Sequence, residues 1–320
     1  MGRDRQGTLV SYRPDIKVLD CTLRDGGLVN NFAFSDEFVR DLYLANIKAG
    51  VDYMEFGYKA SKEIFDPEKF GKWKFCNEKD IRNIVGDNKT DMKISVMADV
   101  GRTDFKKDIL NRKDSVIDLV RVATYINTIP AAIEMLEDAK KKGYETTVNI
   151  MAVSKVNEDD LETGLELLAQ SSVDVIYLVD SFGAFYPEQI ERLSDKYNKK
   201  VGIHAHNNQQ LAFANTIEAL SRGVSYLDAT VSGMGRGAGN CYMELLLSFL
   251  RNPRYNKLAV MSFVEKHMLK LKEEGAVWGY DIPYLLTGTL NSHPSSAINF
   301  IKENRTDYAM FYQELIDNTL

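Results

Sequence analysis

The sequence contains few cysteines, and their spacing fits neither a disulfide framework nor a structural zinc site. Cys21, Cys76 and Cys241 are the three cysteines in 320 residues, an odd number at wide spacing. Zinc fingers need Cys or His pairs a few residues apart, and disulfide frameworks usually show an even count in a short secreted chain. The sequence therefore favours a reducing compartment, and we expect a cytoplasmic protein.

Long apolar runs and an excess of basic charge are also missing. No stretch of about 18 apolar residues occurs, which is roughly the length that crosses a bilayer. Residues 1–14 lack the apolar centre of a signal peptide. The formal net charge is -6, whereas nucleic-acid-binding domains are usually basic. We expect no membrane span, no secretion and no nucleic-acid partner, so a small molecule is the favoured ligand.

Apolar, β-branched segments alternate with amphipathic segments along most of the chain. The strands are expected at 16–23, 51–58, 92–100, 115–124, 146–153, 173–181, 200–206 and 224–232. The helices are expected at 36–49, 79–86, 104–112, 129–142, 158–170, 187–198, 209–222 and 240–251. Eight strand-helix units with buried, parallel-type strands predict an α/β fold, a (β/α)8 TIM barrel. A doubly wound sheet is the alternative.

The strand-helix alternation stops near residue 255. A helix expected at 259–274, the aromatic segment VWGYDIPYLL and a final helical run follow, with no Pro-, Gly- or Ser-rich linker before them. We predict a catalytic (β/α)8 barrel over 1–255 and a short C-terminal helical appendage over 256–320. The appendage would pack over the barrel mouth or at a subunit contact. Its aromatic residues are compatible with a homodimer.

Two histidines lie two residues apart on the seventh expected strand, in GIHAHNN. Alternate strand residues face the same side, so His204 and His206 both point inward if the strand lines a barrel. Alone, this short pattern more often marks hydrogen-bonded core histidines than metal ligands. Asp25, expected at the same end of the first strand, adds a carboxylate. Two histidines and a carboxylate form a facial set that leaves positions open on a divalent ion, so substrate could chelate it.

Arg24 and two glycines flank this carboxylate in VLDCTLRDGG. We expect Gly26 and Gly27 to let the chain turn sharply after the strand. Arg24 would place a cation beside the metal, which helps if negative charge builds up on a substrate oxygen, as in an enolate. The alternative is an ordinary Arg-Asp surface pair.

Other polar residues are expected where strands end, the location of active sites in barrels. They are Glu55, Asp99, Arg121 and Asp180. The glycine-rich VSGMGRGAGN, residues 231–240, follows the eighth strand, whereas a dinucleotide-binding loop follows a first strand and has an acidic residue about 20 positions on. We therefore expect this loop to bring Asn240 and backbone N–H groups towards metal or substrate.

Three motifs in the order DCTLRDGG, GIHAHNN and GMGRGAGN, on strands one, seven and eight, resemble the metallolyase (DRE-TIM, HMGL-like) barrels. These include 4-hydroxy-2-oxovalerate aldolase, hydroxymethylglutaryl-CoA lyase and the isopropylmalate and homocitrate synthases. With RVAT at 121–124, the chain looks most similar to the 4-hydroxy-2-oxovalerate aldolase branch. The resemblance implies a divalent-metal-dependent aldolase, a carbon-carbon lyase acting on a 4-hydroxy-2-oxo acid through a metal-stabilised pyruvate enolate.

The resemblance also implies roles for individual residues. The implied metal ligands are Asp25, His204, His206 and, as a further ligand, Asn240. The implied catalytic residues are Arg24, for the enolate, and Glu55, which would orient Arg24. The expected substrate-binding residues are Arg121, Asp180, Gly235 and Tyr284. The expected ion is Mn²⁺, with Mg²⁺, Co²⁺ or Zn²⁺ as alternatives, and the expected partner is a small 2-oxo acid.

One position departs from the aldolases that the chain resembles. They carry a histidine, taken as the general base, three residues after the metal-binding aspartate, and Leu28 stands there in this chain. Candidate replacements are Tyr58, Tyr280, Tyr284, His293 and a metal-bound hydroxide, although each tyrosine is more commonly a packing residue.

This departure keeps two other functions open. One is a Claisen-type synthase that adds an acyl-CoA enolate to a 2-oxo acid, and the other is a non-catalytic relative that binds metal and oxo acid. The chain also seems short of the C-terminal region through which bacterial aldolases channel product to an acylating aldehyde dehydrogenase, so we do not expect that partner.

Overall fold

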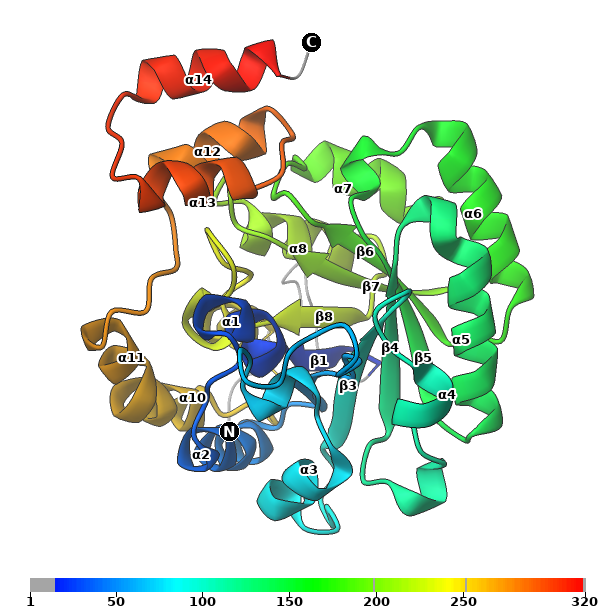
Figure 1. Ribbon diagram of the computed structural model, residues 1–320. Coiled ribbons are helices and arrows are strands. Elements are labelled where there is room, and N and C mark those ends of the chain that lie inside the picture. The colour runs from blue at the N-terminus through cyan, green and yellow to red at the C-terminus, as the bar shows by residue number, and fades with distance from the viewer. Residues whose placement is uncertain (1–14, 198, 251, 319–320) are drawn as a thin grey trace.

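Eight parallel strands form a closed barrel in the computed structural model, which describes residues 15–197, 199–250 and 252–318. The strands are β1 Lys17–Asp20, β2 Tyr53–Tyr58, β3 Lys93–Asp99, β4 Leu119–Thr124, β5 Glu145–Ile150, β6 Val175–Asp180, β7 Lys200–Ala205 and β8 Tyr226–Ala229. Each strand pairs with its neighbour in sequence, and β8 closes on β1. The predicted (β/α)8 barrel is confirmed (Figure 1).

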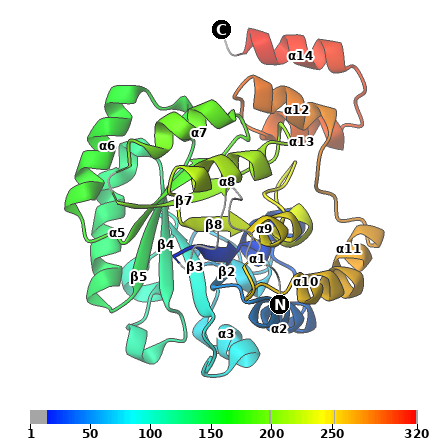
Figure 2. The same ribbon diagram turned by 180° about the vertical axis from the view of Figure 1, so that it is seen from behind.

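Helices surround this barrel (Figures 1 and 2). They are α1 Thr22–Asn30, α2 Asp36–Ala49, α3 Glu78–Val85, α4 Phe105–Asp108, α5 Ile129–Lys141, α6 Glu158–Gln170, α7 Pro187–Ser194, α8 Ala212–Ser221 and α9 Met243–Leu250. Helix α4 is shorter than the predicted helix 104–112. The predicted helix ends at residues 198 and 251, and the expectations for residues 1–14, lie outside the described residues.

Helix α2 shows how local sequence sets these limits. Ser35 precedes it and accepts a hydrogen bond from the backbone N–H of Phe38, which satisfies a free donor of the first turn. Gly50 ends it in the left-handed conformation that glycine adopts most readily. Between them, the buried side chains recur at helical spacing and pack in the core around the barrel.

The segment after β1 is a helix, so the predicted sharp turn at Gly26 and Gly27 is wrong. Both glycines lie inside α1. A Cβ on Gly26 would lie 2.8 Å from Sδ of Met234, and one on Gly27 would lie 2.2 Å from the ring of Phe32. The glycines are needed because other side chains pack directly against the helix backbone.

Glu55 and Arg121 do not end their strands, so this part of the prediction is also wrong. Each is the third residue of a six-residue strand, β2 or β4, and has 0% exposure. Both side chains belong to the barrel interior. Polar residues within these strands therefore do not mark the barrel mouth.

The chain beyond α9 packs as two separate parts. Helix α10 Lys257–Phe263, a π-helical turn Val264–Met268 and α11 Leu269–Glu273 lie beside α2 and share the main core, which reaches Trp278. The remaining helices are α12 Ile282–Thr289, α13 Ser295–Lys302 and α14 Tyr308–Asp317. They stack together at one end of the barrel and have their own small core (Figure 1). The packing thus changes after Trp278, later than the boundary predicted at residue 255.

No helix among the described residues is both long enough and apolar enough to cross a membrane.

Candidate metal centre

A cavity of about 220 Å³ opens at the barrel end where the strands finish. Tyr58, Asp99 and Thr124, which end β2, β3 and β4, line it together with His204 and His206 at the end of β7. Active sites of barrel enzymes lie at this end, because the loops after the strands converge there.

Three candidate metal ligands meet on one wall of the cavity. Oδ2 of Asp25, in the first turn of α1, lies 3.6 Å from Nε2 of His204 and 3.6 Å from Nε2 of His206. The three candidate ligand atoms all lie within 4.8 Å of one another. The structure therefore brings together the two histidines and the carboxylate that the motifs had suggested.

Two buried atoms close to Asp25 lack a hydrogen-bond partner in the described part of the chain, and a cation bound there would give each of them a partner. Nε2 of His206 and Oδ1 of Asn240 have no hydrogen-bond partner among the described residues. An unpaired buried polar group costs about 1–3 kcal/mol, and both atoms can coordinate a divalent ion. Burial lowers the pKa of His206 to about 3, so its imidazole is neutral and able to bind metal. These residues fit a divalent metal ion.

The carboxylate of this site is held in its charged form. Burial raises the pKa of Asp25, but the nearby Arg24 and the two histidines outweigh this effect and hold the pKa well below its usual range. Asn240 also donates a hydrogen bond from Nδ2 to Oδ2 of Asp25. The Asp25 carboxylate is therefore charged at neutral pH and available to a cation.

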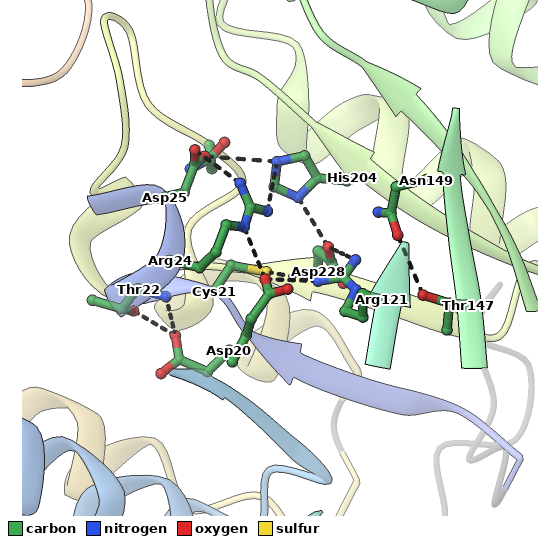
Figure 3. Close-up of polar contacts among 12 residues, drawn as sticks. Asp20, Cys21, Thr22, Arg24, Asp25, Arg121, Thr147, Asn149, His204 and Asp228 are labelled. Atoms are coloured by element: carbon green, nitrogen blue, oxygen red, sulfur yellow. Dashed lines mark hydrogen bonds and ion pairs between the residues drawn. The ribbon is translucent and has the colours of Figure 1, made fainter. Parts of the chain in front are cut away.

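Asp228 in β8 orients one of the histidines, and our sequence reading did not select it. Its Oδ2 lies 2.9 Å from Nδ1 of His204, which leaves Nε2 of the ring on the side of Asp25 (Figure 3). Burial raises the pKa of Asp228, but Arg121 and His204 lower it to about 2 overall. A carboxylate behind a histidine ligand fixes its tautomer and raises its basicity. The one signal in the sequence was an acidic residue in the apolar strand YLDA.

A chain of alternating charges lies beneath the candidate ligands (Figure 3). Arg24 contacts Asp25 at 3.0 Å through Nη1 and donates to Oε2 of Glu55 at 2.9 Å through Nε. Arg121 donates to the same Glu55 oxygen at 2.9 Å and to Asp228 at 2.6 Å. Glu55 is therefore placed to hold Arg24 in position.

A second group of ligand types is less suited to an ion. Cys21, His204 and Asp228 also offer atoms within 4.8 Å of one another. Burial raises the pKa of the Cys21 thiol well above its usual range, so the thiol is protonated at neutral pH. Because a thiol must be deprotonated to bind metal, the set that contains Asp25 is the better candidate.

Comparison with known protein families assigns the chain to one of them. The HMGL-like family model matches residues 15–264. The chain belongs to the HMGL-like family. The relationship predicted from its motifs is therefore confirmed.

Several members and solved structures resemble this HMGL-like chain. Oxaloacetate decarboxylase of Mycobacterium tuberculosis is 30% identical over 73% of this chain and 69% of its own. The 4-hydroxy-2-oxovalerate aldolase of Pelotomaculum thermopropionicum is 29% identical over 76% of this chain and 72% of its own. The N-terminal domain of a Bacteroides vulgatus protein assigned as an aldolase superposes with a TM-score of 0.79 at 29% identity, covering 89% of this chain and 96% of that one.

The four residues expected to bind substrate in this HMGL-like chain lie in different places. Arg121 is buried below the cavity and stacks on Tyr177, 4.4 Å from the ring centroid. Asp180 accepts two backbone N–H groups of the loop after β6, and burial raises its pKa to about 7. Tyr284 lies in the small core of α12, α13 and α14. None of these three lines the cavity, so their predicted contact with substrate is not supported by their positions.

Gly235, the fourth, lies directly against the candidate centre. A Cβ there would lie 2.2 Å from Nδ2 of Asn240 and 3.0 Å from Oδ2 of Asp25. The absence of a side chain at Gly235 therefore lets the loop after β8 approach the candidate metal ligands.

Two of the residues considered as replacements for the missing base line the cavity, and so does Leu28. They are Tyr58 and His293, the latter from the loop before α13. Burial raises the pKa of Tyr58 beyond its usual range, so its hydroxyl is protonated at neutral pH. Burial, with a smaller effect of Arg236, lowers the pKa of His293, so its ring is neutral.

Proposed function

We propose that the protein is a divalent-metal-dependent aldolase that cleaves or forms the C3–C4 bond of a 4-hydroxy-2-oxo acid. The main support is the convergence of Arg24, Asp25, His204 and His206 on one cavity wall in a chain of the HMGL-like family. Several relatives at 28–29% identity that are named 4-hydroxy-2-oxovalerate aldolase favour this reaction.

In this proposal Asp25, His204 and His206 would hold the ion, and Oδ1 of Asn240 is the further donor. A bound divalent ion supplies a Lewis acid that polarises the 2-oxo group of the substrate. Mn²⁺ is the ion we expect, with Mg²⁺, Co²⁺ or Zn²⁺ as alternatives, because mixed nitrogen and oxygen donors accept all of them.

Arg24 would stabilise the charge that the reaction creates. When the C3–C4 bond breaks, its electron pair becomes the C2–C3 double bond of the pyruvate enolate, and negative charge develops on the C2 oxygen. The guanidinium lines the cavity and is fixed by its contacts with Asp25 and Glu55. A cation fixed in advance needs little reorganisation as the charge appears, which is how such groups lower barriers.

Asp99 is our candidate for the base that takes the proton of the 4-hydroxyl group. It lines the cavity, and its Oδ1 has no hydrogen-bond partner among the described residues. Burial raises its pKa, against the opposing effect of Lys74 and Arg102, and a carboxylate with a raised pKa is a stronger base. Protonation of the enolate at C3 then completes the release of pyruvate and an aldehyde.

His293 would donate a hydrogen bond to the same substrate oxygen. Its Nδ1 accepts a hydrogen bond from the backbone N–H of Ser295 at 3.1 Å. The neutral ring therefore carries its proton on Nε2, as a donor rather than a base. This division of roles would compensate for Leu28.

The test is metal-dependent pyruvate release from 4-hydroxy-2-oxo acids of increasing chain length. We expect release with Mn²⁺, none with chelator, and loss of at least about 100-fold in Asp25→Asn and His206→Ala, since each removes a ligand. His267→Ala is the control, because His267 lies on the outer helices and pairs with Asp41. Release that persists with chelator, or in both site variants, would contradict the proposal.

Decarboxylation of oxaloacetate is the second candidate, favoured by the Mycobacterium tuberculosis relative. Loss of CO2 from oxaloacetate breaks the corresponding C3–C4 bond and leaves the same enolate, but no hydroxyl proton has to be removed. CO2 release from oxaloacetate that survives in Asp99→Asn, without pyruvate release from any 4-hydroxy-2-oxo acid, would favour the decarboxylase over the aldolase.

A further inference from the structure

The cavity contains more positive charge than a substrate with a single carboxylate would use. Besides Arg24, the lining includes Lys74, Arg102 and Arg236. Arg24 has carboxylate partners, whereas no ion pair within 4.0 Å joins any of the other three to an acidic residue in the described part of the chain. Outside the candidate metal centre, Asp99 is the one carboxylate among the lining residues.

Lys74 is the most unusual of these cations, because four aromatic rings surround its ammonium group. Nζ lies 4.3 Å from the ring centroids of Tyr58 and Phe65, 5.0 Å from that of Phe32 and 5.8 Å from that of Phe70. The residue is 6% exposed. Ring faces attract a cation, but they do not replace the hydrogen-bond acceptors that a buried ammonium group loses with water.

Two neighbouring lysines find their partners within the protein. Lys59 is buried to a similar degree and donates to the carbonyl oxygen of Cys76 at 2.7 Å. Lys72, two residues before Lys74, pairs with Asp36 and stacks on a tryptophan ring. Neither lines the cavity. Lys74 lines it without an acceptor from the described residues, so a ligand in the cavity is its natural partner.

The position of Lys74 fits the far end of a bound substrate. Its ring partner Tyr58 ends β2, and Asp99, which interacts electrostatically with both Lys74 and Arg102, ends β3. His204 and His206 lie at the end of β7, and β8 and β1 lie between β7 and β2 in the closed barrel, while Asp25 follows β1. A substrate whose 2-oxo acid end is at the metal ligands can therefore extend across the cavity towards Lys74 and Arg102.

We propose that Lys74 and Arg102 form a subsite for an anionic group on the aldehyde half of the substrate. The inference rests on the proposed function and narrows it: the 4-hydroxy-2-oxo acid carries a carboxylate or phosphate at its far end. Such a group would form charge-assisted hydrogen bonds with both cations. A neutral aldehyde would displace water from the Lys74 ammonium group and offer it no acceptor, so the cavity selects against it.

The first test measures binding and does not depend on turnover. 2-Oxoglutarate and 2-oxovalerate share one carbon skeleton and differ in the terminal carboxylate, so their affinities for the Mn²⁺-loaded protein isolate the subsite. Calorimetry should give 2-oxoglutarate an advantage of about 10- to 100-fold, the usual range for a hydrogen bond between charged groups. The advantage should fall most strongly in Lys74→Met, where Arg102 alone remains, and persist in Lys74→Arg.

Lys72→Met is the matched control, because Lys72 belongs to the same turn as Lys74 but does not line the cavity. The advantage of 2-oxoglutarate should persist in this variant. Arg102→Gln is the second variant: its side chain is exposed, so folding is not at risk, and the advantage should shrink. Equal affinities in the wild type overturn the proposal. So does an advantage that survives undiminished in both Lys74→Met and Arg102→Gln.

The second test identifies the anion. The rate of pyruvate addition is compared for succinic semialdehyde, glycolaldehyde phosphate and propionaldehyde. Faster addition to a charged aldehyde than to propionaldehyde supports the subsite, and the faster of the two charged aldehydes shows whether it prefers carboxylate or phosphate. Fastest addition to propionaldehyde overturns the proposed subsite. No addition to any aldehyde, together with a retained preference for 2-oxoglutarate, rejects the proposed function and leaves the subsite standing.

Discussion

Asp228 affects the candidate ion through a residue that it orients. It lies behind His204 and neutralises Arg121, and its own carboxylate is not among the residues lining the cavity. Asp228→Asn keeps the shape and removes the charge. We expect Mn²⁺ affinity to fall about 10- to 100-fold, as observed for carboxylates behind histidine ligands. Electron paramagnetic resonance of free Mn²⁺ measures this affinity.

The control for this prediction is Asp174→Asn, which removes a carboxylate that pairs with Lys140 on the outer surface. Its Mn²⁺ affinity should equal that of the wild type. If Asp228→Asn also binds Mn²⁺ as the wild type does, then Asp228 serves only the packing of the barrel interior.

Asp99 should determine the acidic side of the pH dependence. The base must be ionised, and burial raises its pKa above the ordinary 3.8, so kcat/KM should fall as the pH drops through that raised value. Asp99→Asn should lower kcat about 10²- to 10⁴-fold and remove this acidic limb. A pH profile from steady-state pyruvate release tests both. An unchanged acidic limb in Asp99→Asn would assign the base to another group.

At the scale of secondary-structure elements, α1 carries Arg24 and Asp25 and is held at its start by Asp20. The Asp20 carboxylate accepts hydrogen bonds from the backbone N–H of Thr22 at 3.0 Å and from Nδ2 of Asn46 at 2.6 Å. Burial outweighs these bonds and raises the pKa of Asp20 from 3.8 to about 6. The folded protein therefore binds a proton at this position more tightly than the unfolded chain.

This raised pKa predicts a pH-dependent stability. Between pH 3.8 and about 6 the folded state holds more protons, so the unfolding free energy falls as the pH rises through this window. The difference between a pKa of 3.8 and one of about 6 corresponds to about 3 kcal/mol of unfolding free energy. Urea unfolding at several pH values gives the unfolding free energy of each protein. This free energy should fall more steeply with rising pH in the wild type than in Asp20→Asn. Parallel curves for the two proteins would exclude Asp20 as the source.

The sequence predicts most elements of this fold but not α1, and the reason is physical. Apolar runs such as VIYLVD are typical of strands buried on both faces, and such runs, alternating with amphipathic segments, predict the eight strands of the barrel. Two adjacent glycines cost a helix about 1 kcal/mol each relative to alanine, so the local signal opposes α1. Packing against Phe32, just after the helix, and against Met234, in the loop after β8, overrides that preference.

Some residues of the candidate site could likewise be predicted from the sequence, and others could not. The spacing of His204 and His206 follows from strand periodicity, and Asp25 could be found because it closely follows an apolar strand segment, although it lies in α1. Arg121 was misplaced and Asp228 was missed, because their ion pair crosses the barrel interior between β4 and β8. Such a contact depends on closure of the barrel, which a linear pattern does not describe.

At the scale of the whole molecule, a bound ion would link distant parts of the chain. Asp25 comes from α1 and the histidines from the end of β7, so metal binding favours the folded state. Mn²⁺ at about 100 times its dissociation constant should raise the unfolding free energy by about 2.7 kcal/mol. Thermal unfolding with Mn²⁺ and with chelator should show this difference in the wild type.

Asp25→Ala provides the comparison for this measurement, since it lacks the anionic ligand. Its unfolding temperature should not respond to Mn²⁺ or to chelator. An equal response in both proteins would place the stabilising ion elsewhere on the chain.

The place of His293 in the sequence has a consequence for substitutions after the barrel. This residue lines the cavity, yet it follows the segment matched by the family model, which ends at residue 264. In the proposed mechanism the barrel would provide the ligands for an ion, while the tail would provide a hydrogen-bond donor for the substrate. On that proposal, a substitution in the tail would alter the contact with the substrate and leave the candidate metal ligands of the barrel in place.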